Sequence, residues 1–398
     1  VLDVDSGKAW IGVNNVFYAA DGGTDGNPVT GANPTFTIPA AKAKDLVNFT
    51  GKLGSSSDVY IANFGQDSSF AGNKTAQGNA DSGGIGDFYY TPPTGFLALC
   101  TSNLPDVAVV PSEHFNTVLY TGNATARSIT GVGFQPDLVW TKGRSLNWQN
   151  RLTDSVRGAG KELESDATGA ENTSNDLTSF NSDGFALGTS NNGNANGVSF
   201  VAWNWKANGS GSSNTNGSIN STVSANVDAG FSIVSYTGNG TAGATVGHGL
   251  TVAPEMIFEK KRSATDHWQV YNKDLHASTP EDWYLILNLS NAVMDYEGIW
   301  NDTAPTNSVF SLGSYGGGNQ SSATYIAYCF HSVTGYSKFG SYTGNGSATG
   351  PVVTTGFSPA LVIVKSTSTG GWVMLDTTRD TVNPAQKYLY AQSYARLL

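Results

Sequence analysis

The sequence is poor in charge and in cysteine. Only 13% of its 398 residues are Asp, Glu, Lys or Arg, the formal net charge is −10, and Lys and Arg form no cluster. Binding to nucleic-acid phosphates needs a concentrated basic patch, so the composition argues against DNA or RNA as a partner. Cys100 and Cys329 each stand among apolar residues, which predicts buried free thiols and makes a disulfide or metal site the minority alternative.

Long apolar runs are also missing. No run approaches the roughly 20 residues that a membrane helix needs, so membrane insertion is not expected. No charged-then-apolar signal segment opens the chain, which begins at Val1 in mid-pattern (VLDVDSGKAWIGV). From this start we expect the natural protein to extend further toward its N-terminus. Apolar residues at 39% and aromatics at 11% are nevertheless enough for a sizeable core.

Three copies of one pattern divide most of the chain. The motif YTGN begins at Tyr120, Tyr236 and Tyr342, at domain-sized intervals that indicate tandem modules. In each copy a Pro is followed six residues later by a Lys, with a short apolar run between them. Such runs, bounded by Pro and polar turns, are typical of strands. The Pro–Lys pairs are Pro136 and Lys142, Pro254 and Lys260, and Pro359 and Lys365.

These landmarks predict the domain boundaries. Residues 112–206 and 226–334 form two complete β modules, and 335–398 form a third that stops before its closing hairpin. Residues 207–225, rich in Gly, Ser and Asn, are predicted to be a flexible linker whose second half can add an edge strand to the next module. No segment has a sustained helical period with capping signals. The predicted fold class is all-β, with tandem β-sandwich or jelly-roll-like modules in an elongated string.

The second copy contains GNGTAG at residues 238–243, a match to the dinucleotide-binding fingerprint. That fingerprint needs a helix after the glycines, but the residues that follow are rich in β-branched residues, Gly and Pro. The other two copies lose the third glycine. A hairpin turn at Gly238–Gly240 therefore explains the motif better than a nucleotide site.

Residues 1–105 carry three further motifs: DVDSGKAWIGV, ANFGQ and TPPTGFLALCTSNLP. The first continues into a break at Asn14-Asn15, as a β-hairpin would. Together the motifs resemble the C-terminal half of a SPRY-type β-sandwich in tailed-phage virion proteins, and the first half of that sandwich is not present. On YTGNG, GFxPxLVxxK and SVRG, the later modules resemble repeats in phage structural and tail-fibre-like proteins, especially of marine and cyanobacterial phages. The resemblance implies a virion component and brings no catalytic residues with it.

Acidic residues raise the alternative of an enzyme, because a phage fibre can carry a polysaccharide depolymerase. Such a hydrolase needs two acids at a fixed short separation. Asp154, Asp274 and Asp376 recur in step with the modules, and a position repeated in every copy more often serves the fold. The five histidines show no metal-ligand spacing, and no nucleophile motif occurs. We therefore expect no enzyme activity and no catalytic residues.

Three tryptophans are the candidate ligand-binding residues. Trp148, Trp268 and Trp372 each follow the Lys of their module and are able to present stacking faces to a sugar. The alternative is that they pack in the core or between modules, which we favour.

Calcium is the only cofactor that the sequence suggests. Asp3 and Asp5, and separately Asp21, Asp25 and Asn27, supply clustered oxygen ligands, but their spacing does not match an EF-hand loop. Asx-rich turns explain the same residues without an ion. No cofactor is expected.

The resulting hypothesis is a structural virion protein of a tailed bacteriophage: a tail fibre, an appendage or a head decoration on the particle surface. Its expected partners are other copies of itself, with trimers common among fibres, other virion proteins and host-surface glycans. A depolymerase, and a bacterial surface adhesin of similar build, are the alternatives.

Overall fold

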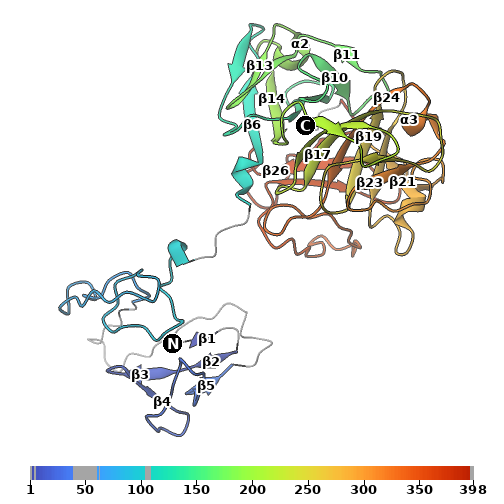
Figure 1. Ribbon diagram of the computed structural model, residues 1–398. Coiled ribbons are helices and arrows are strands. Elements are labelled where there is room, and N and C mark those ends of the chain that lie inside the picture. The colour runs from blue at the N-terminus through green and yellow to red at the C-terminus, as the bar shows by residue number, and fades with distance from the viewer. Residues whose placement is uncertain (1, 4–5, 39–60, 62, 104–108, 395–398) are drawn as a thin grey trace. The chain divides into compact units, whose positions relative to one another are not determined.

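The computed structural model describes residues 2–3, 6–38, 61, 63–103 and 109–394. The chain forms two compact units, residues 1–106 and 107–398 (Figure 1), and each is described by itself.

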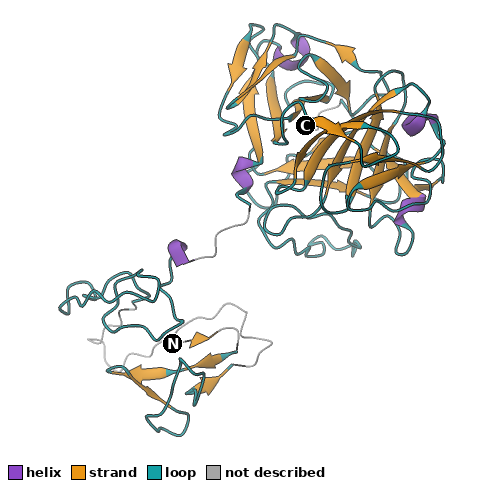
Figure 2. Cartoon of the chain, in the orientation of Figure 1, coloured by secondary structure: helices purple, strands orange, loops and turns teal. Residues whose placement is uncertain are grey.

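The N-terminal unit consists mainly of loops with a few short strands (Figure 2). One three-stranded antiparallel sheet consists of β1 (Leu2–Asp3), β2 (Lys8–Ala9) and β5 (Phe36–Thr37). A separate hairpin consists of β3 (Ile11–Val13) and β4 (Val16–Tyr18). Asn14 and Asn15 join β3 to β4 with φ values of 49° and 64°. Two successive left-handed residues make the turn that matches strand twist in a hairpin, so the predicted break forms as expected. After β5, the next helix or strand along the described chain is the short 3-10 helix η1 (Thr101–Asn103).

The second unit contains all three repeats, which we call repeat 1 (112–206), repeat 2 (226–334) and repeat 3 (335–398). The six-stranded sheet of repeat 1 has the order β11-β10-β9-β8-β14-β6. Its strands are β6 (Phe115–Thr121), β8 (Leu138–Gly143), β9 (Arg151–Asp154), β10 (Lys161–Glu164), β11 (Asn172–Thr173) and β14 (Ser199–Trp205). A small second sheet consists of β7 (Arg127–Ile129), β12 (Leu177–Asn181) and β13 (Gly184–Leu187).

Repeat 2 follows the same plan, with an eight-stranded sheet in the order β15-β16-β17-β24-β19-β20-β21-β22. Its strands are β15 (Ser212–Asn214), β16 (Ser221–Asn226), β17 (Phe231–Thr237), β19 (Met256–Lys261), β20 (Trp268–Asn272), β21 (Trp283–Ile286), β22 (Met294–Asp295) and β24 (Thr324–Phe330). The second sheet pairs β18 (Ala244–Gly247) with β23 (Val309–Leu312).

Repeat 3 has a single described sheet, of β25 (Leu361–Lys365), β26 (Trp372–Asp376) and β27 (Leu389–Tyr390). The described helices of the second unit are single turns: η2 (Pro111–Glu113), α2 (Asn191–Asn194), η3 (Pro280–Asp282) and α3 (Gly316–Asn319). The all-β prediction is therefore confirmed (Figure 2).

The main sheets of repeats 1 and 2 are buried on both faces. Side chains alternate along a strand, so neighbouring residues enter different cores. In repeat 1, Val139 and Ala202 pack in a local core against the small sheet, whereas Trp140 and Trp203 face the opposite way. Repeat 2 has a corresponding local core that includes the free, buried Cys329.

The inner faces of the three repeats meet in one shared core. Its buried members include Trp203 from repeat 1, Trp268 and Tyr328 from repeat 2, and Trp372 and Met374 from repeat 3. The repeats are therefore not arranged as an elongated string within this unit. Each main sheet has a second apolar face, and burying it requires the other repeats.

The stretch 207–225, expected to be a flexible linker, contains β15 and most of β16. β16 pairs with β17 along six residues, and Val223 is buried. Main-chain hydrogen bonds to a neighbouring strand do not depend on side-chain polarity, so a polar Ser/Asn/Thr sequence still extends the sheet here.

Candidate functional site

The three repeats contact one another through equivalent residues at the start of β9, β20 and β26. The registers with β8, β19 and β25 align Asn150, Trp268 and Trp372 at this position. Each side chain donates a hydrogen bond to a main-chain carbonyl of another repeat. The acceptors are themselves equivalent, so the contacts run from repeat 2 to 1, from 3 to 2 and from 1 to 3. The N···O distances are 2.8 Å for Trp268 Nε1 to Glu164 O, 2.9 Å for Trp372 Nε1 to Ile286 O, and 3.1 Å for Asn150 Nδ2 to Tyr390 O.

The lysine of each Pro–Lys pair makes a second set of contacts in the same cyclic order. Each ammonium group donates to a main-chain carbonyl of the repeat that its neighbouring Trp or Asn also contacts. The Nζ···O distances are 2.8 Å for Lys142 to Ser393, 3.2 Å for Lys260 to Thr168, and 2.8 Å for Lys365 to Asn291. Burial lowers the pKa of both Lys142 and Lys260 to about 8, because the charged form loses water.

Two buried carboxylates, each paired with an arginine of its own repeat, accept a third set of hydrogen bonds between the repeats. In repeat 1, Arg157 Nε pairs with Asp154 Oδ2, both side chains are fully buried, and the Tyr328 hydroxyl of repeat 2 donates to the same carboxylate at 2.8 Å. In repeat 3, Arg379 pairs with Asp376 in the same way, and Trp203 Nε1 of repeat 1 donates to Asp376 at 3.1 Å. These carboxylates therefore hold repeats together and are not exposed to a substrate.

Repeat 2 departs from this pattern. The strand registers align Asp154 and Asp376 with Asn272, whereas sequence spacing aligned them with Asp274. Asp274 lies two residues further on, half-buried in the turn after β20. A neutral amide replaces the carboxylate, and no arginine follows it three residues later.

The three predicted ligand-binding tryptophans do not form a common surface. Trp268 and Trp372 are only 0% and 2% exposed, so neither ring is available to stack on a sugar. Trp148 is half-buried over Gly143, in the loop before β9, and Asn150 takes the position equivalent to the other two. The alternative of packing between modules applies to Trp268 and Trp372.

A buried carboxyl group without a cationic partner lies in the local core of repeat 2. Glu259 is 0% exposed, and its Oε1 lies within hydrogen-bonding distance of the Tyr236 hydroxyl. That hydroxyl also donates to the Gly318 carbonyl at 2.8 Å. Burial raises the pKa of Glu259 from 4.5 to about 8, so near neutral pH the carboxyl group is mainly protonated and able to donate to the tyrosine oxygen. No sequence signal separated this residue from an ordinary strand position.

Repeat 1 holds a different buried acidic group. Glu162 pairs with Arg151 at 2.7 Å, and burial together with the nearby Asp176 raises its pKa. All three residues are less than 10% exposed. Two acids are close here, as hydrolysis requires, but they lie inside the sandwich where a polysaccharide has no access.

Two hollows among the described residues are candidate binding sites. One, of about 380 Å³, lies in repeat 2 and is lined by Glu297, Asn301, Asp302 and Ser314, with Ala242 and Gly298. Loss of water and the surrounding carboxylates raise the pKa of Asp302. The chemistry of this lining suits hydroxyl-rich or cationic groups.

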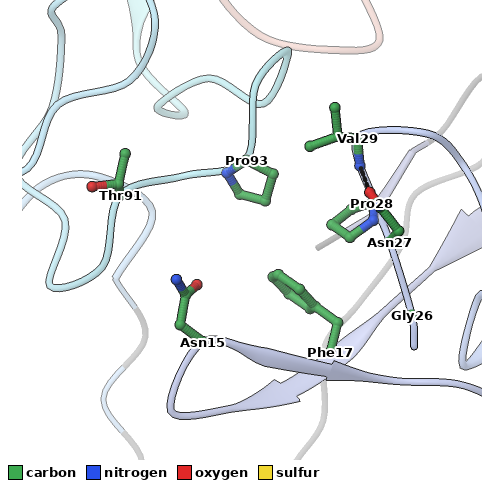
Figure 3. A pocket seen from close by; sticks show the side chains of 8 residues that line it. All are labelled: Asn15, Phe17, Gly26, Asn27, Pro28, Val29, Thr91 and Pro93. Carbon is green, nitrogen blue, oxygen red and sulfur yellow. Dashed lines mark hydrogen bonds between the residues drawn. The ribbon is translucent and has the colours of Figure 1, made fainter. Parts of the chain in front are cut away.

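The other hollow, of about 280 Å³, belongs to the N-terminal unit. Figure 3 shows Phe17 and Pro28 facing Pro93 across it, with the Val29 amide bound to the Asn27 side chain at 3.0 Å. Ligand pockets usually enclose at least about 300 Å³, so this hollow lies just below the usual range.

The acidic residues proposed as calcium ligands make turn contacts. Asp21 Oδ1 accepts from the Gly23 amide at 2.9 Å, and Asp25 Oδ2 accepts from Asn33 at 2.8 Å. Asp3 accepts from Ser6, and Asp5 lies outside the described residues. Across the described ranges no three His, Cys, Asp or Glu side chains are grouped to hold a metal, and no helix there has the length and apolarity to cross a membrane. The absence of a cofactor stays a prediction.

These observations define the second unit as an all-β assembly of related repeats closed around one core. The chain belongs to the family described as a domain of unknown function, DUF7483, whose model matches residues 110–396. That match covers all three repeats together. Comparisons with curated proteins and with solved structures gave no match.

Replacing Arg157 with Met tests the buried pair. The substitution leaves the buried Asp154 side chain without its cationic partner, so we expect the free energy of unfolding to fall by about 3–5 kcal/mol. Urea denaturation measures the loss. The matched control is Lys273→Met, which removes a pair with Glu255 whose side chains are 38% and 20% exposed, and should cost at most about 1 kcal/mol. Equal, small losses in the two variants would contradict this role for Arg157.

Glu259 predicts a specific pH dependence. Its pKa is raised in the folded chain, so the folded state holds a proton that the unfolded state releases above about pH 4.5. Stability is therefore lost as pH rises from about 4.5 to about 8, by up to ~1.4 kcal/mol per pH unit. Glu259→Gln should remove this part of the slope in urea denaturation. The exposed Glu113→Gln control should retain it, and a wild-type slope in Glu259→Gln would refute the assignment.

Proposed function

We propose that this chain is a non-enzymatic structural protein of a tailed-phage virion, serving as a tail fibre, appendage or head decoration. The observation that carries the proposal is the use made of the recurring residues. All three recurring lysines, two of the three recurring tryptophans and two of the three recurring aspartates form contacts between repeats; Trp148 and Asp274 are the exceptions. A sequence pattern maintained for assembly favours a structural role over catalysis.

The N-terminal motifs supply the virion part of the proposal. TPPTGFLALCTSNLP and its companions resemble tailed-phage virion proteins, and the repeats resemble phage structural and fibre-like proteins. A low-charge surface rich in Gly, Ser, Asn and Thr is compatible with a protein exposed on a particle. We expect its partners to be further copies of itself and other virion proteins, with trimers a common arrangement in fibres.

Host-surface glycan is the proposed ligand. Trp268 and Trp372 are too deeply buried to contribute, so the binding surface must use other groups. The hollow around Glu297 and Asp302 offers carboxylate and amide oxygens to sugar hydroxyls, and Tyr296 beside it is 45% exposed. Exposed aromatic rings next to polar groups are typical of glycan contacts.

The competing function is polysaccharide depolymerisation. Asp154 and Asp376 are engaged with arginines inside the unit, which leaves Asp274 as the most accessible of the three recurring acids. A single half-buried acid does not provide the two carboxyl groups that glycoside hydrolysis uses. A bacterial surface adhesin is distinguished by location, since it would be found on cells and not on particles.

Antibody-gold labelling of intact phage particles tests the proposed location. We expect gold at a fixed position on head or tail of particles that carry this protein. A matched control uses particles of a phage lacking the gene. Label on the bacterial surface, with bare particles, would favour the adhesin and overturn the proposal.

A turnover assay tests the absence of catalysis. Purified protein incubated with host polysaccharide should release no reducing ends above the heat-denatured control, because the recurring acids serve packing. Asp274→Asn should change neither this result nor the thermal midpoint by more than a few degrees. Release by the wild-type chain that Asp274→Asn abolishes would establish the depolymerase.

A further inference from the structure

Repeat 1 brings a lysine and an amide together at its contact with repeat 3. Continued by one position, the register of β8 with β9 places Lys142 opposite Asn150, on the same face of the sheet. Directly opposite side chains have Cβ atoms about 5 Å apart. Both side chains are buried, at 1% and 0% exposure, and both donate to the Ser393 carbonyl oxygen, at 2.8 and 3.3 Å. The Lys142 amine and the Asn150 amide are therefore neighbours inside the protein.

The same amide group has two further polar neighbours. The Asp166 carboxylate accepts hydrogen bonds from the Asn150 main-chain N–H at 3.3 Å and from Asn150 Nδ2 at 3.4 Å. Trp140 Nε1 donates to the amide oxygen, Asn150 Oδ1, at 3.3 Å. One amide carbon thus has around it an amine, a carboxyl group and a donor to its carbonyl oxygen. Acyl transfer needs these three roles: a nucleophile, a proton carrier and a group that stabilises charge on the oxygen.

Repeats 2 and 3 have different residues at both positions. Opposite their lysines stand Trp268 and Trp372, whose indole rings offer no amide carbon to an amine. In the place of Asp166 they have Asn288 and Gln392. The side-chain oxygens of these two residues accept the main-chain N–H of the tryptophans at 3.0 and 2.7 Å. A neutral amide is therefore sufficient for the fold at this position, and repeat 1 departs at the two positions that supply an electrophile and an acid.

We propose that Lys142 and Asn150 form an intramolecular isopeptide bond, with Asp166 as the group that transfers the protons. The new bond joins Lys142 Nζ to Asn150 Cγ, and Nδ2 leaves as ammonia. The product links β8 covalently to the start of β9, beside the contact with repeat 3.

The reaction balances without an outside reactant. Asp166 takes one proton from the Lys142 ammonium group, and the neutral Nζ attacks Cγ of Asn150. The electron pair of the C=O bond moves to Oδ1, where the indole N–H of Trp140 stabilises the negative charge. Asp166 then gives its proton to Nδ2, the pair on Oδ1 returns, and the Cγ–Nδ2 bond breaks. The leaving ammonia takes the surplus proton of Nζ and departs as ammonium.

Burial favours the first proton transfer. Loss of water lowers the pKa of Lys142 to about 8 and raises the pKa of Asp166 to about 6. An exposed lysine and an exposed aspartate have pKa values of about 10.4 and about 3.9. Moving a proton from the ammonium group to the carboxylate therefore costs much less free energy at this site than at the surface.

Mass spectrometry tests the proposal. The purified protein should be lighter than its sequence mass by one ammonia molecule. Trypsin does not cut after a lysine whose amine is bonded, so digestion should give residues 128–144 joined to residues 145–151 as one branched peptide. A cyclic imide at Asn150 would also lose ammonia, but it would leave these two peptides separate. Either the full sequence mass or separate peptides would overturn the proposal.

Asp166→Asn is the matched variant, because Asn288 shows that an amide preserves the main-chain hydrogen bond at this position. Without the proton carrier the reaction should slow by at least about a hundredfold, so this variant should keep its full mass when the wild-type chain is fully cross-linked. Cross-linking at the wild-type rate would refute the role of Asp166. Lys142→Met removes the nucleophile, and ammonia loss in this second variant would overturn the proposed bond.

Discussion

Everything in the second unit depends on a buried side-chain donor of one repeat reaching a main-chain carbonyl of another. A strand-end carbonyl that faces an apolar core costs free energy unless it accepts a hydrogen bond. A buried indole N–H is a donor only, so it needs an acceptor from elsewhere in the molecule. Trp268 and Trp372 satisfy both requirements while filling the core. Asn150 does so at the third junction with an amide and a smaller volume. Closure of the sheets around one core follows from these contacts.

Several charged side chains of this low-charge chain lie buried where the repeats meet. Lys142 and Lys260 lie almost entirely out of water with their ammonium groups on carbonyls, and Arg157 and Arg379 neutralise carboxylates in the interior. Buried pairs of this kind add little net stability over a well-packed apolar contact, but a wrong alignment leaves a charge unpaired. These pairs therefore determine which sheets pack against each other, whereas apolar packing alone specifies this arrangement only weakly.

Much of the secondary structure was predictable, and the association of the repeats was not. The apolar run before Lys142 and the break at Asn14-Asn15 gave a strand and a hairpin where both occur. A strand buried on both faces loses its alternating pattern, so the second core left no periodic signal. Differences in loop length also made the equivalent residues of the repeats difficult to recognise from the sequence. The loop before β9 places Asn150, and not Trp148, at the position equivalent to Trp268.

The pseudo-symmetry of the three repeats has an evolutionary consequence. If three separate identical chains formed this arrangement around a shared core, any substitution would appear at all three contacts between repeats at once. Each contact would then have to tolerate the substitution. Carried on a single polypeptide, the junctions are free to drift independently. Asn150 stands at one junction where the other two have Trp, and Asn272 stands in repeat 2 where the others have the Asp–Arg pair; three identical chains could not differ in this way.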